Sequence, residues 1–267
     1  MNNLAVISVA VAPIHRDPDF SSEMVTQELL WERVKIIGSK NNWHQIQTQD
    51  GYLGWIHSFY ICDVNVPNND FMKITDRFVP IFSNLNEPDS IVMILSFATN
   101  VHVIKKLNDF IKIQLPDGTH AFMENQRKVF ENNRQNLIKC SKTLLGVPYL
   151  WGGTSSFGYD CSGFVQAVLK VMGLSIKRDT SQQIKHKGLK EIDLLDGKPG
   201  DLIFFSKNNK INHVAFFIGD GKIIHCSGQV KIESIKGDHM DANKDLCQYD
   251  KRIMSISKLI DDNVDIS

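Results

Sequence analysis

The stretch YDCSGFVQAVLKVMG, residues 159–173, decides how the C-terminal half of this chain folds. After a turn around Gly158, apolar residues recur every three or four positions from Asp160 onward, which predicts an amphipathic helix. Its apolar stripe consists of Phe164, Val165, Val168, Leu169 and Met172. Cys161 then lies in the first helical turn, where unpaired N–H groups and the positive end of the helix dipole stabilise an anion. We therefore expect a thiol with a lowered pKa at the start of this helix.

Such a cysteine has two interpretations. It can be a nucleophile, with the N–H groups of the same turn binding the oxyanion of an attacked carbonyl. It can also be a small buried hydrophobic residue, as free cysteine often is. The residues downstream of the helix favour the first interpretation.

Two histidines lie in NHVAFFIGDGKIIHCSG, residues 212–228. Two apolar segments flank Gly-Asp-Gly at 219–221, which predicts a β-hairpin. His213 opens the first strand and His225 closes the second, so the hairpin brings them together at one end. We expect His213 to act as base and acid for Cys161, and His225 to fix the tautomer and orientation of the His213 ring.

The composition excludes several classes of protein. The chain has 267 residues, of which 42% are hydrophobic and 22% charged, enough for one good core with smaller modules beside it. Thirty basic and thirty acidic residues cancel, so neither nucleic acid nor an anionic membrane is an expected partner. The sequence contains no run of about 20 apolar residues, so it predicts no membrane span. The apolar run 4–12 has no basic segment before it, which favours a cytoplasmic protein over a secreted one.

The five cysteines are odd in number and include no CxxC pair, which is typical of free thiols in a reducing compartment. Cys226 follows His225 directly, but no set of four metal ligands with zinc-site spacing is present. We expect neither a metal nor a cofactor. Because side chains alternate along a strand, Cys226 should face away from His225.

Upstream of about residue 128 the sequence changes to short strand-like runs separated by turns. Within residues 1–64 their regular spacing predicts a small all-β barrel. The expected strands are Ala5–Ala12, Glu23–Leu30, Glu32–Ile37, Trp43–Gln47 and Gly54–Ile56. A second, weaker copy follows in residues 65–127, where Asp117-Gly118 aligns with Asp50-Gly51. The third domain spans residues 128–267.

Six ordered motifs in residues 136–256 resemble the catalytic domain of NlpC-type cell-wall peptidases. They are GVPYLWGG (146–153), DCSGF (160–164), RDTSQQ (178–183), KPGDLIFF (198–205), HVAFFIG (213–219) and IIHCSG (223–228). The resemblance implies a papain-like α+β domain with helices packed on an antiparallel sheet. It places the catalytic cysteine, histidine and third polar residue at Cys161, His213 and His225, with Tyr149 beside the oxyanion. The alternative for Tyr149 is a half-buried aromatic anchor.

The N-terminal segments 22–37 and 41–61 resemble a bacterial SH3-like domain, so the resemblance implies two such barrels ahead of the catalytic domain. This arrangement is similar to the gamma-D-glutamyl-L-diamino acid endopeptidases. These enzymes recycle free muropeptides that have an N-terminal L-Ala. By resemblance, the substrate-binding residues are Asp160, Ser162, Asp179, Thr180, Tyr52 and Glu23. Asp160 and Asp179 also suit helix N-caps. Where the family usually has Ser and Gly-Glu, this chain has Thr180 and Leu30-Trp31-Glu32.

Other functions stay open at this point. An exported peptidoglycan hydrolase, either a D,L-endopeptidase or an amidase, would use the SH3-like modules as wall anchors. A non-catalytic muropeptide-binding protein would keep the cleft without turnover. A lipid-handling acyltransferase of permuted fold is disfavoured, because its histidine precedes its cysteine. The sequence does not distinguish meso-diaminopimelate from L-Lys at the third stem position, and we expect a monomer.

Overall fold

The computed structural model describes residues 3–64, 70–87, 89–126, 130–237 and 239–260. The chain divides into two compact units. The first comprises Met1–Val129 together with Thr154–Ser156, and the second comprises Phe130–Gly153 together with Phe157–Ser267. The predicted domain boundaries at 64/65 and 127/128 fall against residues 65–69 and 127–129, which lie outside the described residues. Those two boundaries therefore remain predictions.

The first unit begins with a seven-stranded sheet in the order β3-β2-β6-β5-β4-β1-β7. Its strands are β1 (Leu4–Ile7), β2 (Val11–His15), β3 (Met24–Leu29), β4 (Arg33–Lys40), β5 (Trp43–Gln47), β6 (Leu53–His57) and β7 (Ile61–Cys62), with a 3-10 turn η1 (Ser58–Tyr60) before β7. The predicted single strand Ala5–Ala12 is wrong, because this run is divided between β1 and β2. β1 pairs with β4 and β7, whereas β2 pairs with β3 and β6, so the chain must change partners between them.

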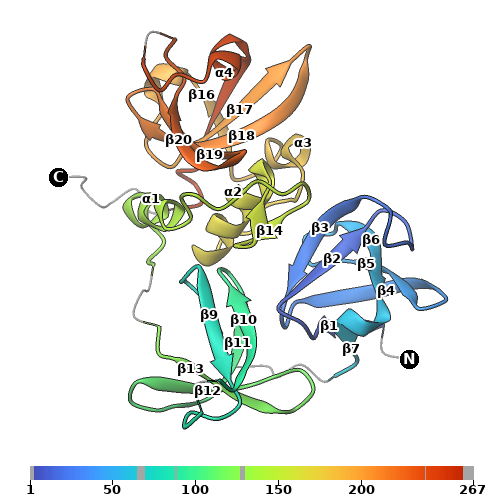
Figure 1. Cartoon of the computed structure of the whole chain (residues 1–267). Coiled ribbons are helices and arrows are strands. Elements are labelled where there is room, and N and C mark those ends of the chain that lie inside the picture. Colours follow the sequence, from blue (N-terminus) through green and yellow to red (C-terminus); the bar gives the residue numbers. More distant parts are fainter. Residues whose placement is uncertain (1–2, 65–69, 88, 127–129, 238, 261–267) are drawn as a thin grey trace. The chain divides into compact units, whose positions relative to one another are not determined.

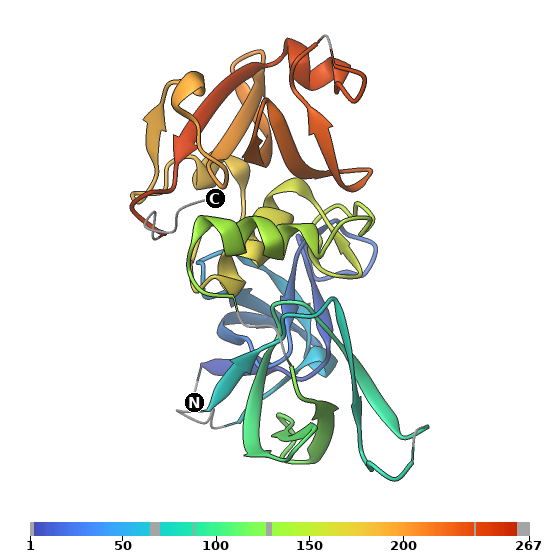
Figure 2. The same ribbon diagram turned by 90° about the vertical axis from the view of Figure 1, so that its left-hand side faces the viewer.

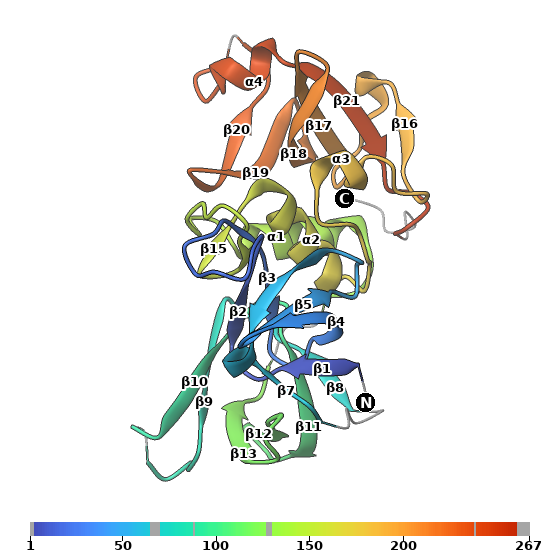
Figure 3. The same ribbon diagram turned by 90° about the vertical axis from the view of Figure 1, so that its right-hand side faces the viewer.

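A second, six-stranded sheet of the same unit has the order β10-β9-β13-β12-β11-β8. Its strands are β8 (Phe71–Lys73), β9 (Phe78–Phe82), β10 (Ile91–Ser96), β11 (Asn100–Lys106), β12 (Phe110–Gln114) and β13 (His120–Glu124). Figure 3 shows the β9–β10 hairpin extending beyond the rest of this sheet. The short strand β14 (Thr154–Ser155) also belongs to the first unit.

Hydrogen bonds of the first sheet recur in the second at positions 67 residues later. In the first sheet, Ile7 N–H donates to Glu32 O, and in the second, Ile74 N–H donates to Thr99 O. Likewise, Trp31 N–H donates to Ile7 O, and Ala98 N–H donates to Ile74 O. The aligned glycines also match, since Gly51 has φ +85° and Gly118 has φ +86°. Such angles are readily adopted only by glycine, which explains why an Asp-Gly pair is found at both turns.

Trp31 accounts for the departure from the Gly-Glu pattern noted in the sequence. Its backbone has φ +67°, a conformation that favours glycine and is uncommon for a tryptophan. Its side chain is 5% exposed and lies in the hydrophobic core of the second sheet, and its indole N–H donates to Gln114 O at 3.0 Å. Burial of a large aromatic group thus compensates for the strained backbone.

The second unit is built on a six-stranded antiparallel sheet in the order β16-β21-β17-β18-β19-β20. Its strands are β16 (Lys190–Ile192), β17 (Leu202–Lys207), β18 (Lys210–Gly219), β19 (Lys222–Ser227), β20 (Gln229–Ser234) and β21 (Asp250–Ser255), with a short strand β15 (Gly158–Tyr159) outside the sheet. The helices are α1 (Arg134–Lys142), α2 (Cys161–Val171), α3 (Thr180–Gln183) and α4 (Lys244–Gln248), with a 3-10 turn η2 (Leu194–Asp196).

Helix α2 packs against β18 and β19, and α1 lies beside it (Figures 1 and 2). Phe164 of α2 meets Phe216 of β18 edge to face, with the ring centroids 5.9 Å apart. Phe164 belongs to the apolar stripe predicted for 159–173, and this stripe is buried. Strands dominate the fold, and no helix of the described residues is long and apolar enough to cross a membrane.

Candidate active site

Asp160 is the N-cap of α2, and its Oδ1 accepts the Gly163 N–H at 2.7 Å. Cys161 is therefore the first residue of the helix. Gly163 is required here, because a Cβ on it would lie 2.1 Å from the carbonyl oxygen of Gly153. The missing side chain lets the loop that carries Tyr149 close against the start of the helix.

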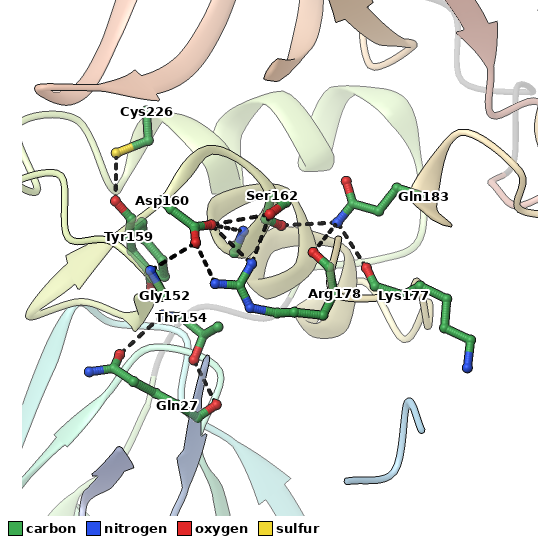
Figure 4. Close-up of polar contacts among 11 residues, drawn as sticks. Gln27, Gly152, Thr154, Tyr159, Asp160, Ser162, Lys177, Arg178, Gln183 and Cys226 are labelled. Carbon is green, nitrogen blue, oxygen red and sulfur yellow. Dashed lines mark hydrogen bonds and ion pairs between the residues drawn. The ribbon is translucent and has the colours of Figure 1, made fainter. Parts of the chain in front are cut away.

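A network of hydrogen bonds saturates the Asp160 carboxylate (Figure 4). Oδ1 accepts from Ser162 Oγ at 3.2 Å and from Arg178 Nη1 at 3.0 Å, in addition to Gly163. Oδ2 accepts from Gly152 N–H at 3.1 Å and forms an ion pair with Arg178 Nη2. Arg178 is 2% exposed, so both charges are buried and each compensates the other.

The sequence argument did not single out Arg178 as a functional residue, although it is the first residue of the RDTSQQ motif. It also donates to Ser162 Oγ at 2.7 Å, so it joins both neighbours of Cys161. Gln183 of α3 supports the same loop by donating to the backbone oxygens of Lys177 and Ser162. The expected role of Asp160 as a helix cap is present in the structure, while its role in substrate binding remains a prediction.

The expected lowering of the Cys161 pKa is wrong in direction. Burial raises the pKa of this thiol to about 11, and the neighbouring Asp160 charge raises it further. The backbone N–H groups of Val214 and Ser162 and the Arg178 charge act in the opposite direction but are outweighed. A thiol with a pKa in this range carries its proton at neutral pH.

His213 and His225 are joined directly. His213 lies on β18 and His225 on β19, and the hairpin brings His213 Nε2 to 2.7 Å from His225 Nδ1. Burial lowers the pKa of both histidines, that of His213 to about 3, with the charge of His225 adding to the effect on His213. Val214, the residue after His213, directs its N–H to the Cys161 sulfur.

The other nitrogen of His225 contacts a residue that the sequence argument missed. Nε2 lies 2.8 Å from Oε2 of Glu233 on β20. His225 pairs with Lys231 across the two strands, so Glu233 is its diagonal neighbour on the same face of the sheet. Cys226 faces away from these groups, as expected, and donates its S–H to Tyr159 O at 3.1 Å.

A cleft of about 570 Å³ opens above the nucleophile. Six of the predicted residues line it, namely Tyr149, Asp160, Cys161, Ser162, Asp179 and Thr180. Trp151 and Arg252 also line it. Burial raises the pKa of Tyr149 to about 12, with the nearby Cys161 and Asp160 adding to the shift, so its hydroxyl keeps its proton and can donate a hydrogen bond.

A second pocket of about 230 Å³ contains His213 but not Cys161. Its other lining residues are Asn212, Ser227, Asn243, Asp245, Leu246 and Tyr249. Asn212 lines both spaces, so they adjoin next to His213. The nucleophile therefore faces one pocket and the base faces the other.

Tyr52 and Glu23, the remaining predicted binding residues, belong to the first unit. The Tyr52 N–H donates to Thr48 Oγ1 at 2.9 Å in the turn before β6, and Glu23 forms an ion pair with Arg16. Their roles toward the substrate remain predictions. Within the described residues, no group of three His, Cys, Asp or Glu side chains could hold a metal ion.

The chain resembles known proteins over most of its length. The NlpC/P60 family matches residues 146–247, and the bacterial dipeptidyl-peptidase Sh3 domain matches residues 14–58. A Bacillus cereus protein named gamma-D-glutamyl-L-lysine dipeptidyl-peptidase is 28% identical over 228 residues, covering 77% of this chain and 68% of that protein. A Bacillus subtilis protein of the same name is 29% identical over 237 residues, covering 83% of this chain and 79% of that protein.

The structural comparison concerns the fold. The crystal structure of an NlpC/P60 family protein from Bacillus cereus matches with a TM-score of 0.81 at 23% sequence identity. The match covers 93% of this chain and 98% of that one.

Proposed function

We propose that this chain, a cysteine peptidase with an NlpC/P60 fold and an N-terminal SH3-like domain, cleaves muropeptides that carry a free N-terminal L-Ala. The bond cut is the one between gamma-D-Glu and the diamino acid that follows. The observation that carries the proposal is the pair of adjoining pockets, one containing the nucleophile and the other the base. The relatives named for gamma-D-glutamyl-L-lysine peptides supply the substrate class.

The reaction begins when the Cys161 sulfur attacks the gamma-carbonyl carbon and the thiol proton passes to His213. The high thiol pKa and low His213 pKa make this transfer part of the attack rather than a preceding step. The backbone N–H of Cys161 and the Tyr149 hydroxyl stabilise the oxyanion. As the C–N bond breaks, His213 protonates the departing amine.

Hydrolysis of the thioester completes the cycle. Water attacks the acyl carbon while His213 takes one of its protons, and the C–S bond breaks. The Cys161 sulfur recovers a proton from His213. The products are L-Ala-D-Glu and a diamino acid or a peptide that begins with it.

The acyl side of the substrate occupies the larger cleft. The ammonium group of L-Ala requires anionic and hydroxyl acceptors in a partly desolvated place, and the cleft offers Asp160, Asp179, Ser162 and Thr180. Arg178 already neutralises much of the Asp160 charge, so Asp179 has the larger share in this scheme.

The leaving side occupies the smaller pocket, because the group that protonates the departing amine lines it. Among the described residues that line it, Asp245 is the one acidic residue and none is lysine or arginine. A carboxylate there attracts the side-chain ammonium of L-Lys. It repels the distal carboxylate that meso-diaminopimelate carries in addition. L-Lys is therefore the preferred third residue in this proposal.

Two further parts of the proposal concern the whole protein. The second sheet, β8 to β13, is a second SH3-like module that acts as a spacer, supported by hydrogen bonds that recur 67 residues apart. The enzyme acts as a monomer in the cytoplasm, in cell-wall peptide recycling. Fractionation of cells followed by immunodetection tests the location.

Mass spectrometry of the reaction products tests the proposed function. Purified protein is incubated with L-Ala-gamma-D-Glu-L-Lys, with its N-acetylated form and with the meso-diaminopimelate equivalent. We expect L-Ala-D-Glu from the free-amine peptides, faster from the L-Lys one. Equal cleavage of the acetylated peptide would indicate a hydrolase of intact peptidoglycan instead. No cleavage of any peptide, combined with tight binding, would indicate a receptor.

A further inference from the structure

We infer that Glu233 is a positioning residue for catalysis, which holds His225, and through it His213, in the tautomer that can accept the thiol proton. The hydrogen-bonded chain runs from His213 through His225 to Glu233, so a fourth side chain joins the three that the sequence predicted. This inference rests on cysteine peptidase chemistry and not on which peptide is cleaved.

The direction of each hydrogen bond follows from the carboxylate. An ionised carboxylate only accepts hydrogen bonds, so His225 Nε2 must carry the proton that it shares with Glu233 Oε2 at 2.8 Å. A neutral His225 then has a lone pair on Nδ1. That nitrogen lies 2.7 Å from His213 Nε2, which must therefore be the donor. Neutral His213 is left with its lone pair on Nδ1, available for the thiol proton.

Three donors keep Glu233 ionised and fixed in place. Asn243 Nδ2 donates to the same Oε2 at 2.7 Å, and Lys231 Nζ lies 2.9 Å from Oε1. Although burial acts to raise the pKa of Glu233, the hydrogen bonds from Asn243, Lys231 and His225 outweigh it and lower the pKa. Asn243 is itself the N-cap of α4, so the position of this amide is set by a helix.

The carboxylate is needed because a second histidine does not define the proton positions by itself. A histidine can carry its proton on either nitrogen, unlike an asparagine side chain, whose donor and acceptor are distinct. If His225 carried its proton on Nδ1, it would donate to His213 Nε2 and leave the His213 proton on Nδ1. That tautomer cannot accept the thiol proton. Glu233 removes this unproductive state and also stabilises the imidazolium formed on His213 during turnover.

Glu233→Gln tests the inference with two readouts that a purely structural residue would not change. The amide can donate as well as accept, so the tautomer is no longer fixed. We expect kcat to fall on the order of 10²-fold with KM within about twofold. The rate of Cys161 alkylation by iodoacetamide should fall with it, and this rate requires no substrate. Glu233→Asp, which keeps the charge, should recover part of the loss.

Glu131→Gln is the matched control, since Glu131 is an exposed glutamate of the same unit, and it should leave kcat and KM unchanged. Glu233→Gln with wild-type kcat, or with a raised KM at unchanged kcat, would overturn the inference. Nitrogen-15 NMR of histidine side chains in the wild-type protein gives a test that does not depend on a variant folding. His213 and His225 should both show the proton on Nε2. A His213 proton on Nδ1 would overturn the inference as well.

Discussion

The start of α2 and the edge formed by β18, β19 and β20 supply the two halves of the active site and are built in opposite ways. Around Asp160 every interaction joins a fixed donor to a fixed acceptor, and the buried charges of Asp160 and Arg178 cancel. From His213 to Glu233 each hydrogen bond depends on where a proton lies. In the proposed mechanism, the first region holds the nucleophile in place and the second moves protons.

The largest effect should come from removing the nucleophile that the rigid region presents. Cys161→Ala should reduce turnover by at least about 10⁴-fold, because no other group can form the acyl intermediate. The folded structure should persist, since the cap, the ion pair and the helix are unaffected. Steady-state kinetics with circular dichroism checks both points. The control is Cys247→Ala, at a half-buried cysteine outside both pockets, which should retain activity. Substantial activity in Cys161→Ala would show that Cys161 is not the nucleophile.

The next largest effect should be on the free energy of unfolding, and it concerns only the region around Asp160. Arg178→Leu leaves the Asp160 carboxylate buried without its counter-charge and should cost about 3–5 kcal/mol in the free energy of unfolding. Arg252→Leu is the control, because the exposed pair of Arg252 and Glu191 should contribute about 0–1 kcal/mol. Urea unfolding measures both. A loss for Arg178→Leu as small as that of the control would show that the region around Asp160 is not held by this pair.

A pH profile tests the protonation states of the proton-moving region. Because burial raises the pKa of Cys161 to about 11, the fraction of thiolate, followed by its ultraviolet absorbance, should increase about tenfold per pH unit between pH 7 and 10, without reaching a plateau. Because the pKa of His213 is lowered to about 3, no step from its titration should occur in this range. A plateau at neutral pH would reveal a preformed thiolate and imidazolium pair, and would contradict this assignment.

The smallest effect should come from the smaller pocket, where a residue that binds the substrate can be changed without changing one that transfers a proton. Asp245→Asn removes one carboxylate at the pocket but leaves His213, His225 and Glu233 unchanged. We expect KM for the L-Lys peptide to rise about threefold to tenfold, kcat to stay within twofold and the preference over meso-diaminopimelate to shrink. Asp220→Asn, in the turn between β18 and β19 and outside both pockets, is the control. An unchanged preference would place the diamino acid elsewhere.

The sequence predicted the elements that local patterns encode. The period of 159–173 located α2, and Gly-Asp-Gly at 219–221 located the hairpin that joins the two histidines. It did not predict that the apolar run from Ala5 to Ala12 bends between two strands, because neither glycine nor proline marks the bend.

The missed features depend on which segments meet in the folded chain. The direction of the Cys161 pKa shift depends on how deeply the thiol is buried, and the start of a helix does not reveal that. Arg178 sits 18 positions from the carboxylate it neutralises, with no local pattern to link them. Glu233 had a weak signal, since alternation in residues 229–234 combined with a tight turn at Gly228 would have set it diagonal to His225.

The position of Trp31 limits how the two sheets of the first unit can be separated from each other. An SH3-like domain is usually treated as a cassette that can be cut out and attached to another enzyme. Here the indole that completes the core of the second sheet comes from the turn between β3 and β4 of the first. Deleting the first sheet would leave a cavity the size of a tryptophan side chain in the core of the second. Expressing the first sheet alone would expose the Trp31 ring to water. We therefore expect that the two sheets can be transplanted or removed only as a pair.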